Sequence, residues 1–415
     1  MILEIIIGIL CIIGFFYVKL RRQWTFWKDH NVPFTPPEFP FGSSVMLTWN
    51  SFRQKTNFNE MARNQAIDLG FPNMDTIATC AFGVNAKSFQ DDDSTFAMNA
   101  KAIFRNSKLE MLKILLALIP GGKTVLYMFD TPISKKGVTM FFYDIIKGTI
   151  EHRVRTKTRR NDLVDLMIDA MKAEIPIEQD KEEDGRFDKD AKLNHKVVHK
   201  QVDEITMVAT ALVILVAGYD TTAQTMAVTS YFLAKNEDIQ EKLYQEIMEC
   251  VGEMESGSGH PDYNQIQSLP YLDMVLHETL RFNPVLGVIT RACTKDYIIP
   301  GTDILLKKGS EVHINAMAIH ANPDIYPDPE KYDPERFTKE AKSNRHPYAF
   351  LGFGQGPRNC IGMRFALLEA KLGLFAVLRK YKFVVTPKTV DKFTLDPSSA
   401  LSSPKEPLLV KVVER

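Results

Sequence analysis

The sequence predicts a mainly α-helical protein with a small amount of β-sheet. Apolar residues recur at helical spacing over residues 202–233, 239–251 and 271–281, which predicts three helices. Short β-prone runs alternate with turn signals between residues 297 and 314, which predicts a small sheet. A continuous apolar segment at the N-terminus stands apart from these elements and predicts a membrane helix.

Composition and charge exclude several classes of protein. The 415 residues are enough for one large domain or two modest ones. The 51 Lys and Arg residues balance the 51 Asp and Glu residues, so we expect no nucleic acid partner. The five cysteines are far apart and form no CxxC pair, which argues against a disulfide framework and a structural zinc site.

The N-terminal 42 residues predict a membrane anchor and a hinge. Residues 1–20 are apolar almost throughout, and about 20 helical residues cross a bilayer core. The basic run that follows predicts that the rest of the chain stays on the cytosolic side. A cleaved signal peptide is the alternative, but no small-x-small cleavage site follows the apolar run. Residues 21–42 end in a proline-rich stretch typical of a stiff hinge, and residues 43–415 form the remaining domain.

Two further segments before residue 200 have recognisable patterns. Residues 111–128 are apolar but broken by proline and glycine, which suits either a surface that dips into a membrane or a buried pair of helices. Residues 159–171 have apolar side chains at helical spacing and predict another helix. Residues 174–200 are highly charged and predict a surface loop and the start of a helix.

A cysteine lies in a loop rich in glycine, FGQGPRNCIG, at residues 353–362. Its glycines permit a tight turn that can pass close to a flat cofactor. Arg358 could pair with an anionic group on such a cofactor. The N-terminus of a helix predicted over residues 361–368 faces the sulfur and would favour a thiolate at Cys360. A buried structural cysteine in a turn is the alternative.

The predicted helix over residues 202–233 contains polar residues in its middle, in the motif AGYDTT. Buried Asp and Thr side chains compete for backbone hydrogen bonds and tend to bend a helix, and an opened turn can hold water. Asp220 and Thr221 could then pass protons to a reacting group. The alternative is that the helix ends at Gly218 and that Asp220 caps the next one.

Two motifs between residues 277 and 337 predict a buried charged cluster. In HETLRFNP, Glu278 and Arg281 are three residues apart and share one helix face. Such pairs are commonly exposed and contribute little, but the apolar neighbours here indicate partial burial. A buried pair needs a further partner, and Arg336 in YDPERF could supply it.

Taken in this order, the motifs resemble those of the cytochrome P450 superfamily. The likeness runs from about residue 75 to the C-terminus and is greatest to membrane-bound, xenobiotic-metabolising animal members, especially those of arthropods. The cysteine loop matches the family pattern FxxGxRxCxG at Phe353, Gly356, Arg358, Cys360 and Gly362. The resemblance implies a mainly α prism with a small β domain.

The resemblance also implies a role for each motif. The Cys360 thiolate would be the axial ligand of a haem iron, and the other matched loop residues would bind the haem. Asp220 and Thr221 would relay protons during oxygen activation. Glu278, Arg281 and Arg336 would form the triad that braces the region before the loop. Arg291 would pair with a haem propionate, with an ordinary exposed arginine beside a strand as the alternative.

The activity implied is monooxygenation of a lipophilic small molecule with O2. Electrons would come from an NADPH-dependent flavoprotein reductase that docks on the cysteine side of the haem. The expected location is the endoplasmic reticulum membrane, with the catalytic domain on the cytosolic side.

One part of the family pattern is missing, which predicts an incomplete N-terminal β and helix region. Members normally have a sheet, a loop that contacts substrate and a helix carrying WxxxR after the hinge. Here the chain passes at residues 71–73 directly into the pattern expected much later, which predicts an internal deletion. WNSFR, at residues 49–53, matches WxxxR, but it precedes the first helix of the domain and is interpreted as a coincidence. Two functions are therefore open: a working monooxygenase, or a membrane-anchored truncated form that is impaired or inactive.

Overall fold

The computed structural model describes part of the chain: residues 73–83, 95–96, 98–99, 113, 116, 122–128, 136–172, 203–252, 261–396, 399 and 401–415. The predicted anchor at 1–20, the hinge at 21–42 and the charged segment at 174–200 lie outside these residues. They stay predictions. The chain divides into two compact units. The smaller unit includes Ser107–Thr131 and Thr290–His313, and the larger unit includes Pro132–Ile289 and Ile314–Arg415.

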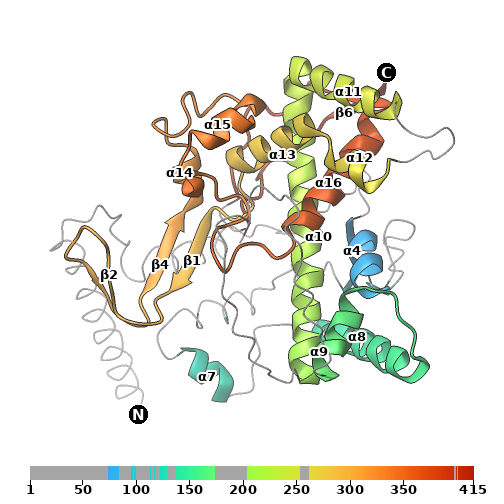
Figure 1. Ribbon diagram of the computed structural model, residues 1–415, viewed down its shortest axis with the longest axis vertical. Coiled ribbons are helices and arrows are strands. Elements are labelled where there is room, and N and C mark those ends of the chain that lie inside the picture. Colours follow the sequence, from blue (N-terminus) through green and yellow to red (C-terminus); the bar gives the residue numbers. More distant parts are fainter. Residues whose placement is uncertain are drawn as a thin grey trace, which may run out of the picture. The chain divides into compact units, whose positions relative to one another are not determined.

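The larger unit is built around one long helix, α10 (Glu204–Lys235) (Figure 1). Helices α4, α8, α13 and α16 pack against it. The other helices of the larger unit are short or flank this group. In chain order the helices are α4 (Asn73–Phe82), α8 (Lys136–Thr156), α9 (Leu163–Lys172), α10, α11 (Glu237–Gly252), α12 (Tyr263–Gln267), α13 (Pro270–Phe282), α14 (Ala316–His320), η1 (Pro334–Phe337), α15 (Lys339–Ser343), η2 (Pro347–Ala349) and α16 (Met363–Leu378).

The helices predicted from periodicity are confirmed. The segment 202–233 corresponds to α10, which begins where the Asp203 carboxylate accepts a hydrogen bond from the Thr206 N–H at 2.7 Å. Segments 239–251 and 271–281 correspond to α11 and α13. The helix predicted at 159–171 begins later, at Leu163, because the preceding N–H groups of Arg160 and Asn161 donate to the Asp165 carboxylate instead of entering a helix.

Two apolar clusters cover the two halves of α10. The first cluster joins its C-terminal half to α11, α13, α16 and β5, with Leu243, Leu272 and Leu374 fully buried. The second joins its N-terminal half to α4, α8 and α9, with Ala78 and Val164 fully buried. The area removed from water in these clusters is the main force that holds the helices together.

The described residues contain three two-stranded sheets and an isolated antiparallel bridge between Leu395 and Pro404. Strand β1 (Val288–Ala292) pairs with β4 (Glu311–Asn315), and β2 (Tyr297–Ile298) pairs antiparallel with β3 (Leu305–Leu306). Strand β5 (Tyr381–Val384) pairs antiparallel with β6 (Lys411–Glu414). The small sheet predicted over 297–314 is thus two sheets, and its first strand begins earlier than predicted.

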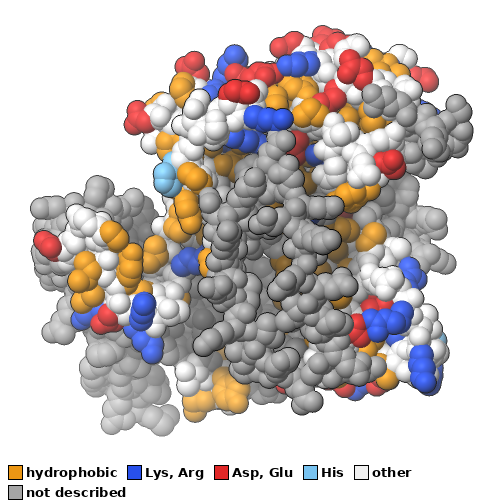
Figure 2. All heavy atoms as spheres, viewed as in Figure 1, with side chains coloured by type: hydrophobic (Ala, Val, Ile, Leu, Met, Phe, Trp, Pro, Cys, Tyr) orange, Lys and Arg blue, Asp and Glu red, His pale blue; other side chains and the backbone are white. Residues whose placement is uncertain are grey.

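The smaller unit exposes apolar side chains on helix α7 (Gly122–Met128). Val125, Tyr127 and Met128 are 41%, 87% and 75% exposed, and α7 appears as an orange group at the lower edge of Figure 2. Among the described residues, α10 is the one helix that is long and apolar enough to cross a membrane, although core helices meet the same test.

Candidate functional site

The cysteine loop is a tight turn closed by its own backbone. The Cys360 N–H donates to the Phe353 carbonyl at 2.8 Å, and the Asn359 N–H donates to the Gly356 carbonyl at 3.0 Å. Gly354 and Gly356 have φ values of +70° and +78°, which other residues rarely adopt. Gly354 and Gly356 are therefore required by the backbone of this loop, whereas Gly362 has a φ of −89° that other residues adopt.

Cys360 is presented at the surface of this loop, just before helix α16. The residue is exposed, but the protein atoms around its sulfur still raise the pKa of the thiol by desolvation. The Gly362 N–H donates to the sulfur and opposes this shift. Gly362 is also the N-cap of α16, so the positive end of that helix lies next to the sulfur. Arg358 lies in the exposed part of the same loop.

The AGYDTT segment lies inside an unbroken helix. Residues 218–222 are helical like their neighbours, so the alternative that the helix ends at Gly218 is wrong. The Thr221 hydroxyl donates to the Ala217 carbonyl at 2.7 Å, which satisfies it within the helix and leaves no need for an opened turn. Burial raises the pKa of Asp220 to about 6, although the side chain retains some exposure.

Glu278 and Arg281 form a fully buried pair on α13. They are 0% and 2% exposed. The guanidinium donates twice to the carboxylate, from Nε to Oε2 at 2.7 Å and from Nη2 to Oε1 at 2.8 Å. Burial raises the pKa of Glu278, and the hydrogen bonds from Arg281 and from the Asp333 N–H oppose this. Arg281 also donates to the carbonyls of His320 at 2.9 Å and of Pro329 at 3.0 Å, so its donors are almost all used.

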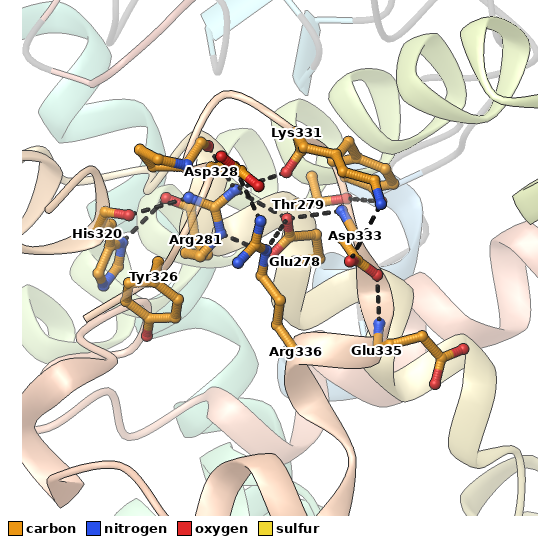
Figure 3. A network of polar contacts seen from close by, with 12 residues as sticks. Glu278, Thr279, Arg281, His320, Tyr326, Asp328, Lys331, Asp333, Glu335 and Arg336 are labelled. Atoms are coloured by element: carbon orange, nitrogen blue, oxygen red, sulfur yellow. Dashed lines mark hydrogen bonds and ion pairs between the residues drawn. The ribbon is translucent and has the colours of Figure 1, made fainter. Parts of the chain in front are cut away.

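Arg336 is brought to the same carboxylate from η1 (Figure 3). Its Nε lies 3.6 Å from Oε1 of Glu278, and its Nη2 donates to the Asp328 carbonyl at 2.9 Å. The structure therefore brings together Glu278, Arg281 and Arg336, as the sequence predicts. What this cluster does for the cysteine loop stays a prediction.

Arg291 lies on β1, where its Nη1 donates to the Thr290 carbonyl at 3.0 Å. It belongs to the smaller unit, whereas Cys360 belongs to the larger one. Its predicted contact with a haem propionate stays a prediction.

Comparison with known proteins identifies the family. A family model described as cytochrome P450 matches residues 48–412. The chain belongs to the cytochrome P450 family. It is 35% identical over 338 residues to the probable cytochrome P450 6a14 of Drosophila melanogaster, covering 81% of this chain and 63% of that protein. It is 36% identical over 348 residues to cytochrome P450 3A16 of Mus musculus, covering 84% and 64%. The chain thus spans less than two thirds of the length of these relatives.

The cofactor of the cytochrome P450 family is haem, and the cysteine loop fits such a group. A Cβ added to Gly356 or Gly362 would meet no atom within 4 Å, so one side of the loop is open. The donor is a thiol that already receives an N–H hydrogen bond. An open glycine-lined loop around an accessible sulfur is what a flat iron-containing ring requires.

Sequence reasoning missed three buried groups on or beside the helices that carry the P450 motifs: Lys371, Glu369 and His320. Lys371 on α16 is 3% exposed and lies 3.2 Å from the Asp273 carboxylate of α13. Burial acts to raise the pKa of Asp273, but His277, Lys371 and Lys342 outweigh it and hold that pKa well below its usual range. Glu369 and Lys371 could have been noticed as charged residues in an otherwise apolar helix. His320, a single histidine near a turn, gives no such signal.

Proposed function

We propose that this chain is a haem-thiolate monooxygenase that oxidises lipophilic small molecules with O2. The observation that carries the proposal is the open Cys360 loop at the N-terminus of α16, in a chain of the cytochrome P450 family. Cys360 would ligate the iron, and Phe353, Gly356, Arg358 and Gly362 would form the loop against the haem. When bound, haem supplies the chemistry that activates O2 and transfers oxygen to substrate.

The residues of the loop and of α16 would stabilise the charge on the sulfur. The Gly362 N–H already points to the sulfur, and it would donate more strongly to a thiolate than to a thiol. The N-terminus of α16 adds a positive partial charge at the same place. Arg291 is proposed to pair with a propionate, as the family resemblance implies.

Asp220 and Thr221 are proposed to move protons. A carboxyl group with a pKa of about 6 can bind and release a proton near neutral pH. Thr221 would have to release the Ala217 carbonyl before its hydroxyl could donate elsewhere.

Partners and location are inferred from the family and from the exposed apolar surface. An NADPH-dependent flavoprotein reductase is proposed as the electron donor. The apolar N-terminal 20 residues and the exposed side chains of α7 support attachment to the endoplasmic reticulum membrane, with the catalytic domain on the cytosolic side.

The second candidate is an impaired or inactive truncated form. One observation favours it: α10 leaves Ile205 and Val213 72% and 64% exposed. An internal deletion near residues 71–73 would expose apolar surface in this way. At roughly 25 cal/mol per Å², several hundred Å² of exposed apolar surface rivals the stability of a domain.

A reduced carbon-monoxide difference spectrum of membranes that express the full chain tests the proposal. We expect the Soret band of thiolate-ligated haem, and we expect Cys360→Ala to abolish it because no other group replaces the sulfur. Cys80→Ala is the matched control, since Cys80 is also an exposed free cysteine and should leave the band unchanged. Absence of the thiolate band from the unmodified chain would favour the impaired form, and an unchanged spectrum in Cys360→Ala would refute the ligand assignment.

If the chain turns over substrate, Thr221→Ala tests the proton relay. We expect NADPH consumption to continue while a larger share of its electrons appears as hydrogen peroxide. Thr225→Ala is the control, because the Thr225 hydroxyl is bonded one turn further along the helix, to the Thr221 carbonyl at 2.9 Å. Equal coupling of NADPH use to product in Thr221→Ala and the parent chain would exclude the relay.

A further inference from the structure

His320, at the end of α14, is buried and uses both of its ring nitrogens. It is 1% exposed. Its Nε2 accepts a hydrogen bond from the Leu351 N–H at 2.8 Å, and its Nδ1 lies 3.1 Å from the Arg281 carbonyl. Because Nε2 accepts a hydrogen bond, the proton must be on Nδ1, which donates to Arg281. The ring therefore satisfies both contacts only as one neutral tautomer.

The surroundings of the ring favour this neutral form. Charged and titratable groups face it from each packed segment: Arg281 from α13, Arg345 from the segment after α15, and Tyr326. Burial and the two nearby guanidinium groups lower the pKa of His320 to about 4. Phe350 stacks on the ring with a centroid distance of 5.4 Å and an interplanar angle of 8°.

His320 both accepts a hydrogen bond from Arg281 and donates one to it, which links it to the buried cluster of Glu278, Arg281 and Arg336. Its carbonyl accepts a hydrogen bond from Arg281 Nη1 at 2.9 Å, while its Nδ1–H donates to the carbonyl of the same arginine (Figure 3). Arg281 in turn holds Glu278 through two hydrogen bonds. The imidazole is thereby fixed in position by α13.

The other ring nitrogen reaches the beginning of the cysteine loop. The Leu351 N–H donates to His320 Nε2, and the Leu351 carbonyl accepts a hydrogen bond from the Gly354 N–H at 3.0 Å. Phe353, two residues further on, accepts the Cys360 N–H. The hydrogen bond from the Leu351 N–H to His320 thus connects the α13 cluster to the backbone segment that closes the loop around Cys360.

We propose that His320 is a positioning residue that holds the start of the Cys360 loop against α13 through its neutral imidazole. The proposal rests on the proposed function for its effect on haem, whereas the link between His320 and Leu351 can be tested without haem. Protonation of Nε2 would remove the acceptor for the Leu351 N–H and place a positive charge beside Arg281 and Arg345.

The pH dependence has a defined sign. The pKa of about 4 in the folded chain is below the ordinary value of 6.5, so the unfolded chain binds more protons between these two values. The link is therefore fully formed above about pH 6.5 and loses stability as the pH falls towards 4.

Three variants of the full chain test the proposal by spectroscopy. His320→Gln can still accept from Leu351 and donate to Arg281, whereas His320→Leu can do neither. His313→Leu is the control, because His313 is exposed on β4. We expect the thiolate form of the carbon-monoxide spectrum to be lost on acidification in the parent chain and in His313→Leu. His320→Gln should lose less of it over the same pH range, and His320→Leu should already be depleted at pH 7.5.

Hydrogen exchange of the residue 350–354 segment, measured by mass spectrometry on the chain without added haem, gives a second readout. We expect His320→Leu to exchange about 10-fold faster, as the loss of one hydrogen bond implies, and His320→Gln to resemble the parent chain. Equal exchange in His320→Leu and the parent chain would overturn the proposal. If the unmodified chain gives no thiolate band, the proposed function fails, while the exchange rates still decide the role of His320.

Discussion

Two buried carboxylates on helices beside α10 have opposite surroundings. Glu278 on α13 accepts hydrogen bonds from Arg281 and from the Asp333 N–H, with Arg336 close by. Glu369 on α16 is 8% exposed, and among the described residues the Thr76 hydroxyl is the one group that acts to hydrogen-bond its carboxyl. Burial raises the pKa of Glu369 to about 8, with the nearby Thr76 hydroxyl opposing the shift, so this carboxyl is mainly protonated at neutral pH.

The two carboxylates differ in the segments that supply their neighbours. The partners of Glu278 come from α13 and from the segment around η1, all of which are present. Glu369 faces Thr76 and Cys80 of α4, which follows closely after the predicted deletion at residues 71–73. The predicted deletion at residues 71–73 stays a prediction.

The largest expected effect is the loss of stability when Glu278, the carboxylate with several hydrogen-bond donors, loses Arg281. Arg281→Ala would leave the Glu278 charge buried and poorly compensated, which costs about 3–5 kcal/mol of unfolding free energy. Arg336→Ala is the control, because its contact is longer and its side chain is 12% exposed. We expect it to cost roughly 1–2 kcal/mol. Urea unfolding followed by circular dichroism measures both, and a loss below about 1 kcal/mol in Arg281→Ala would contradict the importance of the pair.

An intermediate effect is expected from the pH dependence of Glu369. Its folded pKa of about 8 exceeds the ordinary 4.5, so the folded chain binds more protons between these values. The free energy of unfolding should therefore fall as the pH rises from 4.5 to 8 and then level off. The slope is at most about 1.4 kcal/mol per pH unit, and the total fall is a few kcal/mol at most.

Glu369→Gln should reduce this pH dependence, because the amide cannot ionise. Glu335→Gln is the matched control, since Glu335 is exposed and paired with Lys242. Unfolding measured at pH 5, 7 and 9 distinguishes them. A Glu369→Gln profile parallel to that of the parent chain would mean that this carboxyl does not titrate as inferred.

The smallest expected effect is a difference in stability between substitutions of two buried threonines of α10. Thr222 Oγ1 has no hydrogen-bond partner among the described residues, whereas Thr229 Oγ1 donates to the Thr225 carbonyl at 2.8 Å and contacts Thr279 Oγ1 at 3.1 Å. We expect Thr222→Val to be neutral or to stabilise by up to about 1 kcal/mol, and Thr229→Val to destabilise by about 1 kcal/mol. Equal changes in the thermal midpoint would show that the Thr222 hydroxyl has a partner in solution.

Much of the fold and of the candidate site followed from local sequence patterns. Periodicity located α10, α11 and α13 to within a few residues, because spacing along the chain decides which side chains share a helix face. The cysteine loop was recognisable because its glycines are needed for positive φ angles. The helix break at Gly218 was predicted only as an alternative, and it is wrong because residues 218–222 continue α10 without interruption.

The sequence by itself determined the family, the helical core and the position of the cysteine in its loop, because these depend on residues close together in the chain. The tertiary structure decided which buried polar groups have partners. Asp333 reaches Glu278 across 55 residues and Leu351 reaches His320 across 31 residues, while the Glu369 carboxyl has the Thr76 hydroxyl of α4 beside it. Such contacts depend on how distant segments pack, and no local spacing specifies them.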